Sequence, residues 1–333
     1  MRSIGSRILV FYLATTAFAF FVGITLSRVV NLGVGFQFKG EAPSQAITGV
    51  PNFLKVLVEM VPKNVFSSFS NGSLVQIVIF GAFLGVVILL MPEGKKKTAE
   101  DFFRTFADIF LQLVKFVLGY APIGVGALMA GTMGVYGSKV IGPLAKFIGT
   151  VYLGYIIQII LAYFVMLYIF TRMNPFQFLK KTYALYVTTA STCSSLASLP
   201  INLQVAKENL GVPEEVANFT LPLGAAINKD GGSITMACAL GFAAGATGMA
   251  LSIPTQISMI FIGTLMSMGG SGIPGGGIVI IMILTKAFNL PVEIGAILAG
   301  IYRLTDMGGT TMNCMGDLVG TYIVGHSFKP KKS

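Results

Sequence analysis

The sequence predicts an all-α integral membrane protein that contains two re-entrant helical hairpins and a broken core helix. Three observations support this fold class. The 333 residues are 54% hydrophobic and only 11% charged, with a mean hydropathy of +0.79, whereas soluble domains carry about twice that charged fraction. Apolar segments of spanning length, roughly 20 residues, recur along the whole chain. Several of the later segments are interrupted at their centres by polar, glycine-rich or charged stretches.

The basic residues that produce the net charge of +10 cluster at the ends of the apolar segments. They are Arg2, Arg7, Lys95–Lys97, Arg104, Arg172, Lys180, Lys181, Lys329, Lys331 and Lys332. The positive-inside rule places these ends, and with them the C-terminus, in the cytoplasm. The stretch from Gly33 to Pro51 has one Lys and one Glu and fits the outside. This distribution argues against a nucleic-acid partner and for the lipid bilayer.

The first half of the chain consists of simple apolar spans, at about residues 7–32, 50–92, 100–134 and 140–171. Pro62 and the stretch "SFSNGS" break the second of these. The N-terminus has the outline of a signal peptide, but the apolar run continues to about Leu32 without a small-residue cleavage site at the usual distance. We therefore interpret it as a first spanning helix.

The second half contains three interrupted segments. In residues 175–210 the stretch "TTASTCSSLASLP" has seven Ser or Thr among thirteen residues, and residues 252–290 are interrupted by "GGSGIPGGG". The flanking arms of about 14–18 residues are too short for two spans each, so we favour re-entrant hairpins over solvent loops. Between the hairpins, "NKDGGS" (228–233) breaks the apolar segment 213–246. Paired interruptions of this kind indicate a transporter binding site near the bilayer midplane.

The last segment, residues 291–325, carries a polar stripe. At about 100° per residue, Asp306, Thr310, Asn313 and Asp317 fall within roughly 60° of arc. A carboxylate facing lipid would cost on the order of 3 kcal/mol or more, so this stripe must face protein, water or cations. Hard cations such as Na⁺ take carboxylate, hydroxyl and carbonyl oxygens.

Two interpretations of these acids remain open. In the first, the unwound backbone at 228–232 and Asp230 hold cations together with the stripe. In the second, the charges form an internal ion-pair network, Asp306 with Arg303 and Asp317 with Lys229. The stripe favours the first, because Asn and Thr lie among the acids.

Enzymatic functions find little support. Intramembrane aspartyl proteases also use two buried acids, and "MGD" at 315–317 matches the end of their GxGD signature, but the leading glycine and the partner Tyr-Asp motif are missing. The one histidine, His326, lies at the C-terminal end. The cysteines Cys193, Cys238 and Cys314 have no metal-ligand spacing and are expected as small buried residues. A gated ion or anion channel built on the same hairpins stays a plausible alternative to a transporter.

The sequence closely resembles one family, the dicarboxylate/amino acid:cation symporters, which include the sodium-coupled glutamate/aspartate transporter homologues. The resemblance covers essentially the whole chain through "YLATTAFAFFVGI", "MVPKNVFSSFSNG", "YAPIGVGALMA", "TCSSLASLP", "TLPLGAAINKDGG", "GGSGIPGGG" and "DMGGTTMNCMGDLVG". It implies a secondary active transporter, not an enzyme, that uses Na⁺ as coupling ion and no organic cofactor. The substrate would be a small-molecule amino acid or dicarboxylate.

The resemblance also implies an elevator fold, in which a transport domain slides against a trimeric scaffold in the cell (cytoplasmic) membrane. The segments that correspond are 1–33 (first spanning helix, in the transport domain), 50–135 (scaffold helices), 140–171 (transport-domain helix), 175–210 (hairpin 1), 213–246 (broken helix), 252–290 (hairpin 2) and 291–325 (last core helix). Because the match begins at the third helix of the family, we expect this chain to lack the first two.

Three sodium sites are implied by position. Tyr12, Thr15, Thr16, Asn228 and Asp230 match one. Asp317 and Asn313, with the carbonyls of Gly224 and Asn228, match another. A third would lie between Ser267 and Met268 of hairpin 2 and the backbone around Ala226 and Lys229.

The implied substrate site combines both hairpins with the last helix. Its residues are Ser194, Ser195, Gly272, Ile273, Asp306, Gly309, Thr310 and Asn313. Asp306 would take the substrate's amino group, and Asn313 with the hairpin backbone would hold its α-carboxylate.

Departures from the family pattern refine these expectations. Gly309 stands where acid-specific members have an arginine that binds the substrate's second carboxylate. No other side chain offers the planar guanidinium group that makes two parallel hydrogen bonds to a carboxylate. We therefore expect a neutral or unusual substrate, with Arg303 as either an ion-pair partner or a relocated anion reader. Lys229 replaces a methionine, and its ammonium either substitutes for one bound Na⁺ or pairs with an acid.

Overall fold

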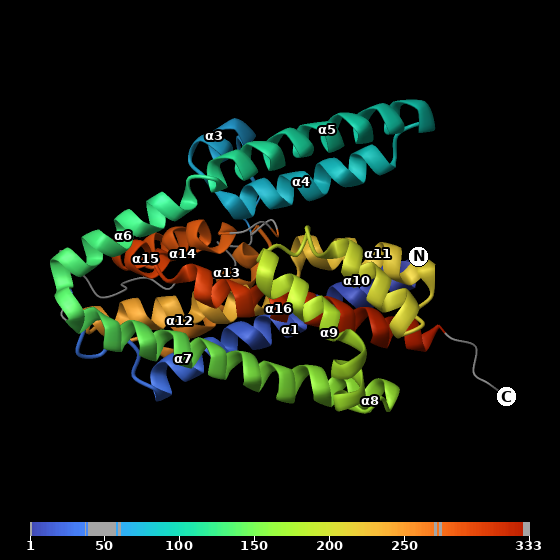
Figure 1. Cartoon of the computed structure of the whole chain (residues 1–333). Coiled ribbons are helices and arrows are strands. Elements are labelled where there is room, and N and C mark those ends of the chain that lie inside the picture. The colour runs from blue at the N-terminus through green and yellow to red at the C-terminus, as the bar shows by residue number, and fades with distance from the viewer. Residues whose placement is uncertain are drawn as a thin grey trace. The chain divides into compact units, whose positions relative to one another are not determined.

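A computed structural model describes residues 2–36, 38, 58, 61–269, 272 and 275–328 (Figure 1). All regular elements in these residues are helices, which confirms the predicted all-α class. The chain divides into two compact units, Met1–Val50 with Thr132–Ser333, and Pro51–Gly131.

The smaller unit contains α3 (Val65–Ser70), α4 (Leu74–Leu89), α5 (Glu93–Leu118) and the first part of α6 (Ala121–Tyr136). The side chain of Asn64 caps α3 by accepting a hydrogen bond from the Ser67 N–H at 3.1 Å. Helices α4 and α5 pack side by side. One face of α5 exposes a row of aromatic rings, namely Phe102, Phe103, Phe106 and Phe110. An apolar row of this kind is suited to lipid or to a partner surface.

The larger unit contains the remaining described helices. They are α1 (Arg2–Val29), η1 (Gly137–Val140), α7 (Ile141–Gln158), η2 (Ile159–Phe164), α8 (Val165–Thr171), α9 (Pro175–Thr192), α10 (Leu199–Gln204), η3 (Val205–Asn209), α11 (Glu214–Ile227), α12 (Asp230–Thr247), α13 (Ile253–Ser267), α14 (Gly276–Ala287), α15 (Val292–Ala299) and α16 (Tyr302–Ser327). Helices α1, α12 and α16 pack against one another at its centre.

Small residues allow these central helices to approach closely. A Cβ added at Gly23 of α1 would lie 2.6 Å from the Ala237 Cβ of α12. A Cβ added at Gly231 of α12 would overlap the backbone of Gly309 in α16. Close backbone contact through glycine and alanine is the usual basis of helix packing in membrane proteins.

Both segments predicted as hairpins contain two helical arms. In the first, α9 ends at Cys193, whose φ of 50° is left-handed, and α10 with η3 forms the second arm. In the second, α13 and α14 form the arms, and the tip residues Gly270, Ser271, Ile273 and Pro274 lie outside the described residues.

The two hairpins meet at their tips. The Ser194 hydroxyl donates to the Gly272 carbonyl at 3.0 Å, and the Leu196 N–H reaches the same oxygen at 3.4 Å. These contacts bring the Ser-rich and Gly-rich interruptions together.

The break between α11 and α12 is shorter than the sequence predicted. Only Asn228 and Lys229 are non-helical, whereas Asp230, Gly231 and Gly232 form the first turn of α12. The helix starts early because an acid is favourable at a helix N-terminus. The Gly231 N–H is also satisfied from outside the helix, by the Asn313 side-chain oxygen at 2.9 Å.

Two other predicted helices are also divided. The segment 291–325 forms α15 and α16, separated by Gly300 and Ile301, whose N–H groups bond carbonyls three residues earlier as in a tight turn. The segment 140–171 contains a π-helical turn, η2, between α7 and α8. Both interruptions lie within continuous apolar stretches, so the hydropathy of the sequence does not reveal them.

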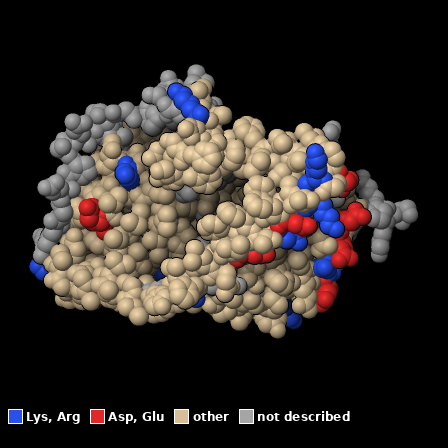
Figure 2. Space-filling model, turned by 90° about the horizontal axis from the view of Figure 1, so that it is seen from above, with Lys and Arg blue, Asp and Glu red and all other residues tan. Residues whose placement is uncertain are grey.

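Two helical stretches among the described residues are long and apolar enough to cross a membrane by length and composition, Ile4–Val29 and Pro122–Thr171. Ile79–Leu89, Ile253–Ser267 and Gly276–Ala287 are shorter apolar helices. Figure 2 shows one face of the molecule, where most charged side chains gather toward the right-hand edge and residues other than Lys, Arg, Asp and Glu cover most of the rest.

Gly33 and Gly35 provide a matched test of the packing between the end of α1 and α12. Both have left-handed φ, +76° and +83°, so alanine at either position costs about 1–2 kcal/mol of backbone strain. Only at Gly33 would a Cβ also overlap the Phe242 carbonyl and lie 2.8 Å from the Ala246 nitrogen. We expect Gly33→Ala to destabilise the protein by about 1–3 kcal/mol more than Gly35→Ala, measured by unfolding in detergent. Equal effects would contradict this packing.

Candidate functional site

Asp230 is a fully buried carboxylate held by three helices. Its Oδ1 accepts hydrogen bonds from the hydroxyls of Thr16 at 2.7 Å and Thr15 at 3.3 Å, both on α1. Its Oδ2 accepts from the Tyr163 hydroxyl at 2.6 Å and the Gln158 amide at 3.4 Å. Four donors around one carboxylate favour its ionised form. The site thus holds a carboxylate inside the helix core through hydrogen bonds from other helices.

The sequence interpretation missed Gln158 and Tyr163. Gln158 is the last residue of α7 and Tyr163 lies in the π-helical turn η2; both are fully buried. The Tyr163 hydroxyl also reaches the Met312 carbonyl at 3.1 Å, and the Gln158 amide the Thr15 carbonyl at 3.1 Å. The available signal was their polarity within the apolar run "GYIIQIILAYF", because a buried amide or phenol needs a partner. π-Helical turns are also frequent at functional sites.

Asp317 on α16 is the second fully buried carboxylate, and it is only partly satisfied. Its Oδ1 accepts a hydrogen bond from the Asn228 side-chain amide at 3.0 Å. Its Oδ2 is buried and has no hydrogen-bond partner in the described protein. The Asn228 side-chain oxygen in turn accepts from Thr16 at 3.2 Å. Asn228 therefore connects the surroundings of the two acids, and Asp317 retains an oxygen that calls for a cation or another donor.

Gly224 marks the position where Asp317 and Tyr12 converge. A Cβ added to Gly224 would lie 2.5 Å from Asp317 Oδ1 and 2.6 Å from the Tyr12 hydroxyl. That hydroxyl donates to the Thr220 carbonyl at 3.0 Å. A glycine is thus required for this cluster of oxygen atoms from α1, α11 and α16. Carboxylate, amide, hydroxyl and carbonyl oxygens are the ligands that a hard cation takes, and the residues fit Na⁺.

Metal sites built from acidic, histidine and thiol ligands have no counterpart in the described part of the chain. No group of three or more His, Cys, Asp and Glu side chains that could hold a metal ion occurs there. The three cysteines are buried and free.

The residues predicted for the third cation site lie around a small cavity, though not all of them line it. Ser267 is fully buried and donates to the Thr264 carbonyl at 2.8 Å. The Lys229 ammonium donates to the Ala225 carbonyl at 2.5 Å. Ser267 and Lys229 line the cavity, but Met268 and Ala226 are not among its lining residues.

This cavity is also where most predicted substrate residues meet. It has about 30 Å³ of space for the centres of water molecules, enough for about two waters. Its lining residues are Cys193, Ser195, Lys229, Gly232, Met236, Ser267, Gly272, Gly277, Tyr302, Asp306, Thr310 and Asn313. Because an amino acid does not fit in this volume, a substrate requires the lining elements to separate.

Asp306 connects the last helix to the second hairpin. Its Oδ2 accepts a hydrogen bond from the Gly275 N–H at 3.3 Å, and its Oδ1 from the Thr310 hydroxyl at 3.4 Å. One and two turns further along the same stripe are Thr310 and Asn313, and Asn313 holds the first turn of α12. The stripe predicted from helical periodicity therefore faces the protein interior, with Asp306 at the cavity and Asp317 in the core.

Two of the predicted substrate residues that the structure describes do not line the cavity. Gly309 faces α7 and α12, since a Cβ there would lie 3.1 Å from the Tyr155 hydroxyl and 3.6 Å from the Gly231 carbonyl carbon. Ser194 instead donates to the hairpin 2 tip at Gly272. Ile273 lies outside the described residues.

The structure does not show the alternative ion-pair network. The ion pairs found between described residues are Lys96 with Glu93 and Lys207 with Glu214. Arg303 is exposed and donates to the Ser191 carbonyl of hairpin 1 at 3.1 Å. Lys229 donates to a carbonyl rather than a carboxylate.

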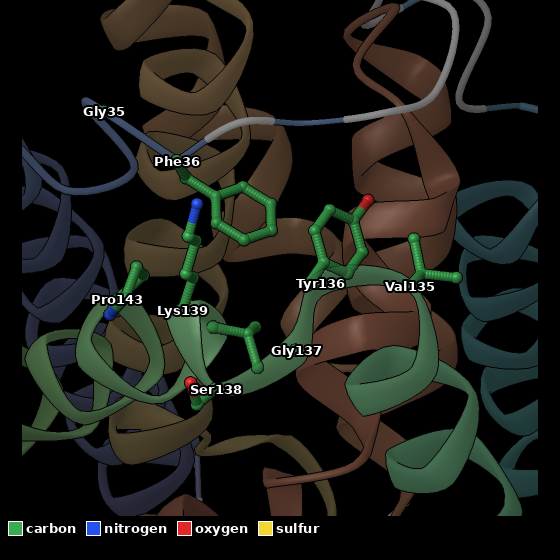
Figure 3. Close-up of a pocket in the computed structure, with 9 residues that line it drawn as sticks. Gly35, Phe36, Val135, Tyr136, Gly137, Ser138, Lys139 and Pro143 are labelled. Carbon is green, nitrogen blue, oxygen red and sulfur yellow. The ribbon is translucent and has the colours of Figure 1, made fainter.

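A larger cavity of about 480 Å³ lies elsewhere in the larger unit and contains none of the predicted site residues (Figure 3). It is lined by residues 35–36, 135–140 and 143. The rings of Phe36 and Tyr136 stand 5.0 Å apart beside it. Lys139 is its charged lining residue, so it lacks the acidic groups that distinguish the small cavity.

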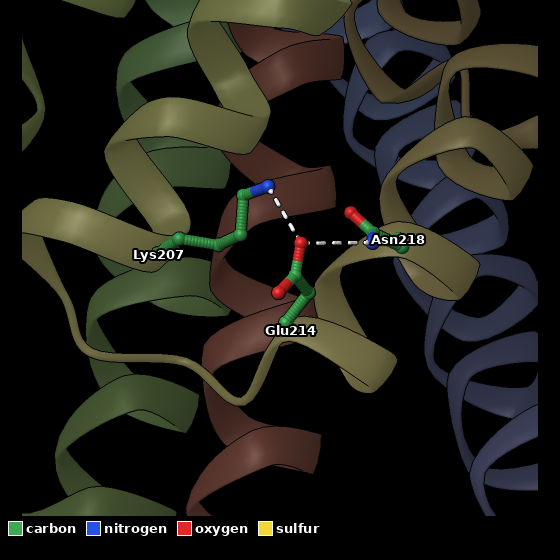
Figure 4. Close-up of polar contacts among 3 residues, drawn as sticks. All are labelled: Lys207, Glu214 and Asn218. Atoms are coloured by element: carbon green, nitrogen blue, oxygen red, sulfur yellow. Dashed lines mark hydrogen bonds and ion pairs between the residues drawn. The ribbon is translucent and has the colours of Figure 1, made fainter.

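A polar cluster at the surface connects η3 to the start of α11 (Figure 4). Glu214 accepts hydrogen bonds from Lys207 at 3.3 Å and from Asn218 at 3.4 Å. The hydrogen bond from Lys207, followed by that from Asn218, lowers the pKa of the Glu214 carboxyl below its ordinary value. Exposed pairs of this kind contribute little to stability, which makes Lys207 a useful control position.

The family of the chain follows from comparison with known proteins. Residues 1–327 match the Sodium:dicarboxylate symporter family. The chain belongs to this family. It is therefore a membrane transporter rather than an enzyme, and the resemblance predicted from its motifs is confirmed.

Several relatives are similar over nearly the whole chain. The "Proton/glutamate-aspartate symporter" of Bacillus subtilis (strain 168) is 28% identical over 330 residues, 97% of this chain and 79% of the relative. The "C4-dicarboxylate transport protein" of the same organism is 27% identical, covering 97% and 78%. The "Neutral amino acid transporter B(0)" of Homo sapiens is 30% identical, covering 95% of this chain and 65% of the relative. Together they support a cation-coupled symporter of amino acids or dicarboxylates.

Gly224→Ala tests whether the oxygen cluster binds Na⁺. The added Cβ would crowd Asp317 and Tyr12, so the variant should lose the stabilisation that Na⁺ provides. A ligand at 100 times its Kd stabilises by about 2.7 kcal/mol, visible as a rise in Tm over choline at equal ionic strength. The control is Gly149→Ala, where a Cβ has nothing within 4 Å. A Na⁺-dependent rise in Gly224→Ala equal to that of the wild type would contradict the assignment.

Tyr163→Phe tests the support of Asp230 by the π-helical turn. Loss of the 2.6 Å hydrogen bond to a buried carboxylate should reduce the free energy of unfolding by about 1.5–3 kcal/mol. The matched control is Tyr168→Phe, an exposed tyrosine of α8, expected within about 0.5 kcal/mol of wild type. Denaturation of both variants in detergent measures the difference, and equal stabilities would show that Tyr163 does not hold Asp230.

Proposed function

We propose that this chain couples the inward movement of Na⁺ to the uptake of an amino acid or related carboxylate, with a neutral amino acid as the preferred substrate. The observation that supports this most directly is Asp317, a fully buried carboxylate with one unpartnered oxygen in a cluster of oxygen ligands. Leaving that charge uncompensated is costly. A transported cation provides the compensation only while it is bound, which is what a coupling ion must do.

The proposed cation ligands come from the groups described above. At Asp230, the hydroxyls of Thr15 and Thr16 now donate to the carboxylate, but each can rotate and present a lone pair to a cation. With Tyr12 and Asn228 they would form one Na⁺ site. Asp317 and Asn313, with the backbone oxygens of Gly224 and Asn228, would form the second. The third position, between Ser267 and Met268 and the backbone around Ala226 and Lys229, is considered further below.

The proposed substrate site is the small cavity in an opened form. Asp306 would bind the substrate's ammonium group, and Asn313 with the hairpin backbone at Ser194, Ser195, Gly272 and Ile273 would hold its carboxylate. Thr310 supports Asp306 through the 3.4 Å hydrogen bond. Among the described residues, no guanidinium that could bind a second carboxylate lines the cavity, which supports the neutral preference.

Opening would come from the second hairpin, which we propose as the outer gate. Its tip is connected to Asp306 through the Gly275 N–H and to hairpin 1 through Gly272, so its position depends directly on the groups that bind the substrate. In the elevator mechanism that the family implies, the larger unit would be the transport domain and Pro51–Gly131 part of the scaffold of a homotrimer. The C-terminus would lie in the cytoplasm of a multi-pass protein.

Uptake by the purified protein in proteoliposomes tests the proposed function. Labelled serine, alanine, aspartate and glutamate are offered with and without an inward Na⁺ gradient. We expect Na⁺-dependent accumulation, highest for serine or alanine. Asp306→Asn should abolish it, because the substrate ammonium loses its charge partner, whereas the exposed Asp108→Asn on α5 should behave as wild type.

Three outcomes would contradict parts of this account. Normal uptake by Asp306→Asn would remove Asp306 from the substrate site. A preference for aspartate or glutamate would show that another group, such as Arg303, reads the second carboxylate. Ion leakage without accumulation of any substrate would favour a gated channel on the same fold.

A further inference from the structure

Lys229 is a buried cation at the break between α11 and α12. It is 4% exposed, and its ammonium donates to the Ala225 carbonyl at 2.5 Å. Lys229 directly precedes α12, whose N-terminus repels a positive charge, and its side chain turns back to a carbonyl in the last turn of α11, where a positive charge is favourable. The ammonium is therefore held by a helix C-terminus, in the way that a bound metal cation would be.

The surroundings of the ammonium are those of a hard-cation site. Lys229 lines the small cavity together with Ser267 and Gly272 of the second hairpin. Gly272 packs against the same Ala225 carbonyl, since a Cβ there would lie 2.7 Å from the oxygen. The Ala225 carbonyl at the end of α11 and the buried Ser267 hydroxyl are oxygen ligands of the kind that Na⁺ binds. The ammonium lies at the contact between α11 and the second hairpin.

The charges in the core explain why a cation is needed there. Asp230 and Asp317 are both fully buried, and Lys229, the neighbour of Asp230 in the chain, is buried as well. Two buried carboxylates and one ammonium leave one negative charge to compensate. Without Lys229 two negative charges would remain, and buried charges without compensation are strongly unfavourable.

We propose that the Lys229 ammonium is a covalently tethered cation that takes the place of one coupling ion between α11 and the second hairpin. The chain then binds one Na⁺ fewer per transported substrate than it would with an uncharged residue at this position. This inference rests on the proposed function, Na⁺-coupled symport. The Ala225 carbonyl takes one of the three N–H donors of the ammonium, so contact with the substrate's carboxylate is the competing role that the tests below separate from this one.

Lys229→Met is the direct test, since it removes the charge and keeps an apolar stem of similar length. In proteoliposomes with the membrane potential held at zero, the limiting accumulation ratio of the substrate equals the Na⁺ ratio raised to the number of coupled ions. Under about a tenfold Na⁺ gradient, the variant should therefore reach about a tenfold higher limiting ratio than wild type. Lys229→Arg keeps the charge and should therefore keep the wild-type ion number. The control for general effects of losing a lysine is Lys207→Met, at a partly exposed position, which should match wild type.

A second measurement does not depend on transport. The Tm of the purified protein in detergent is followed against Na⁺ concentration without substrate, and its slope reports the number of ions bound on folding. Lys229→Met should give a steeper slope than wild type. Lys229→Gln should do the same, because its amide still donates to Ala225 but carries no charge, and it serves as the second variant if Lys229→Met does not fold.

The outcomes separate the role of Lys229 from the proposed function, Na⁺-coupled symport. A wild-type slope and a wild-type accumulation ratio in both uncharged variants would overturn the role of Lys229. Weaker substrate affinity at an unchanged ion number would also overturn it and would make Lys229 a substrate residue. If the wild type shows no Na⁺-driven accumulation, the proposed function fails, and the Tm slopes still decide whether Lys229 replaces a bound cation.

Discussion

The cost of burying two carboxylates in an apolar helical core is the constraint on which the rest of this structure depends. Asp230 and Asp317 are fully buried, and each requires groups from several helices. Asp230 recruits hydroxyls from α1 and a phenol from the π-helical turn η2. Asp317 receives one amide hydrogen bond, through the break between α11 and α12. Gly224, Gly231 and Gly309 lie where neighbouring helices approach so closely that an added Cβ would contact the next helix.

Asp230 and Asp317 differ in the number of hydrogen bonds that they accept, and this difference suggests how cation binding is connected to the substrate cavity. Asp230 has four donors, whereas one oxygen of Asp317 has none in the described protein. Asn228 lies between them, and Asn313 connects the same region to the cavity through the first turn of α12. A cation at Asp317 would thus act on the residues that shape the substrate cavity. By linkage, the substrate must then strengthen cation binding to the same extent.

Much of this arrangement could be predicted from the sequence, because polar residues in an apolar chain must face protein, water or a bound ion. The periodic stripe from Asp306 to Asp317 indicated one inward-facing helix side, and "NKDGGS" indicated a break. Gln158 and Tyr163 were missed because both lie in a continuous apolar run. Tyr163 also lies in a π-helical turn, whose side-chain register simple helical periodicity does not include. The break is only two residues long because Asp230 and the external partner of Gly231 start α12 early. The orientation of Gly309 depends on contact with Gly231 and Tyr155, and a single sequence contains no record of such a contact.

Hydrogen exchange of the substrate-free protein in Na⁺ and in choline tests most directly whether the two carboxylates form a cation site. The account predicts that Na⁺ slows amide exchange in peptides that cover the α11–α12 break around Asn228 and the part of α16 around Asp317. Peptides from α4 and α5 in the other unit serve as internal references and should not change. Equal exchange in both salts at the break and at α16 would contradict the account.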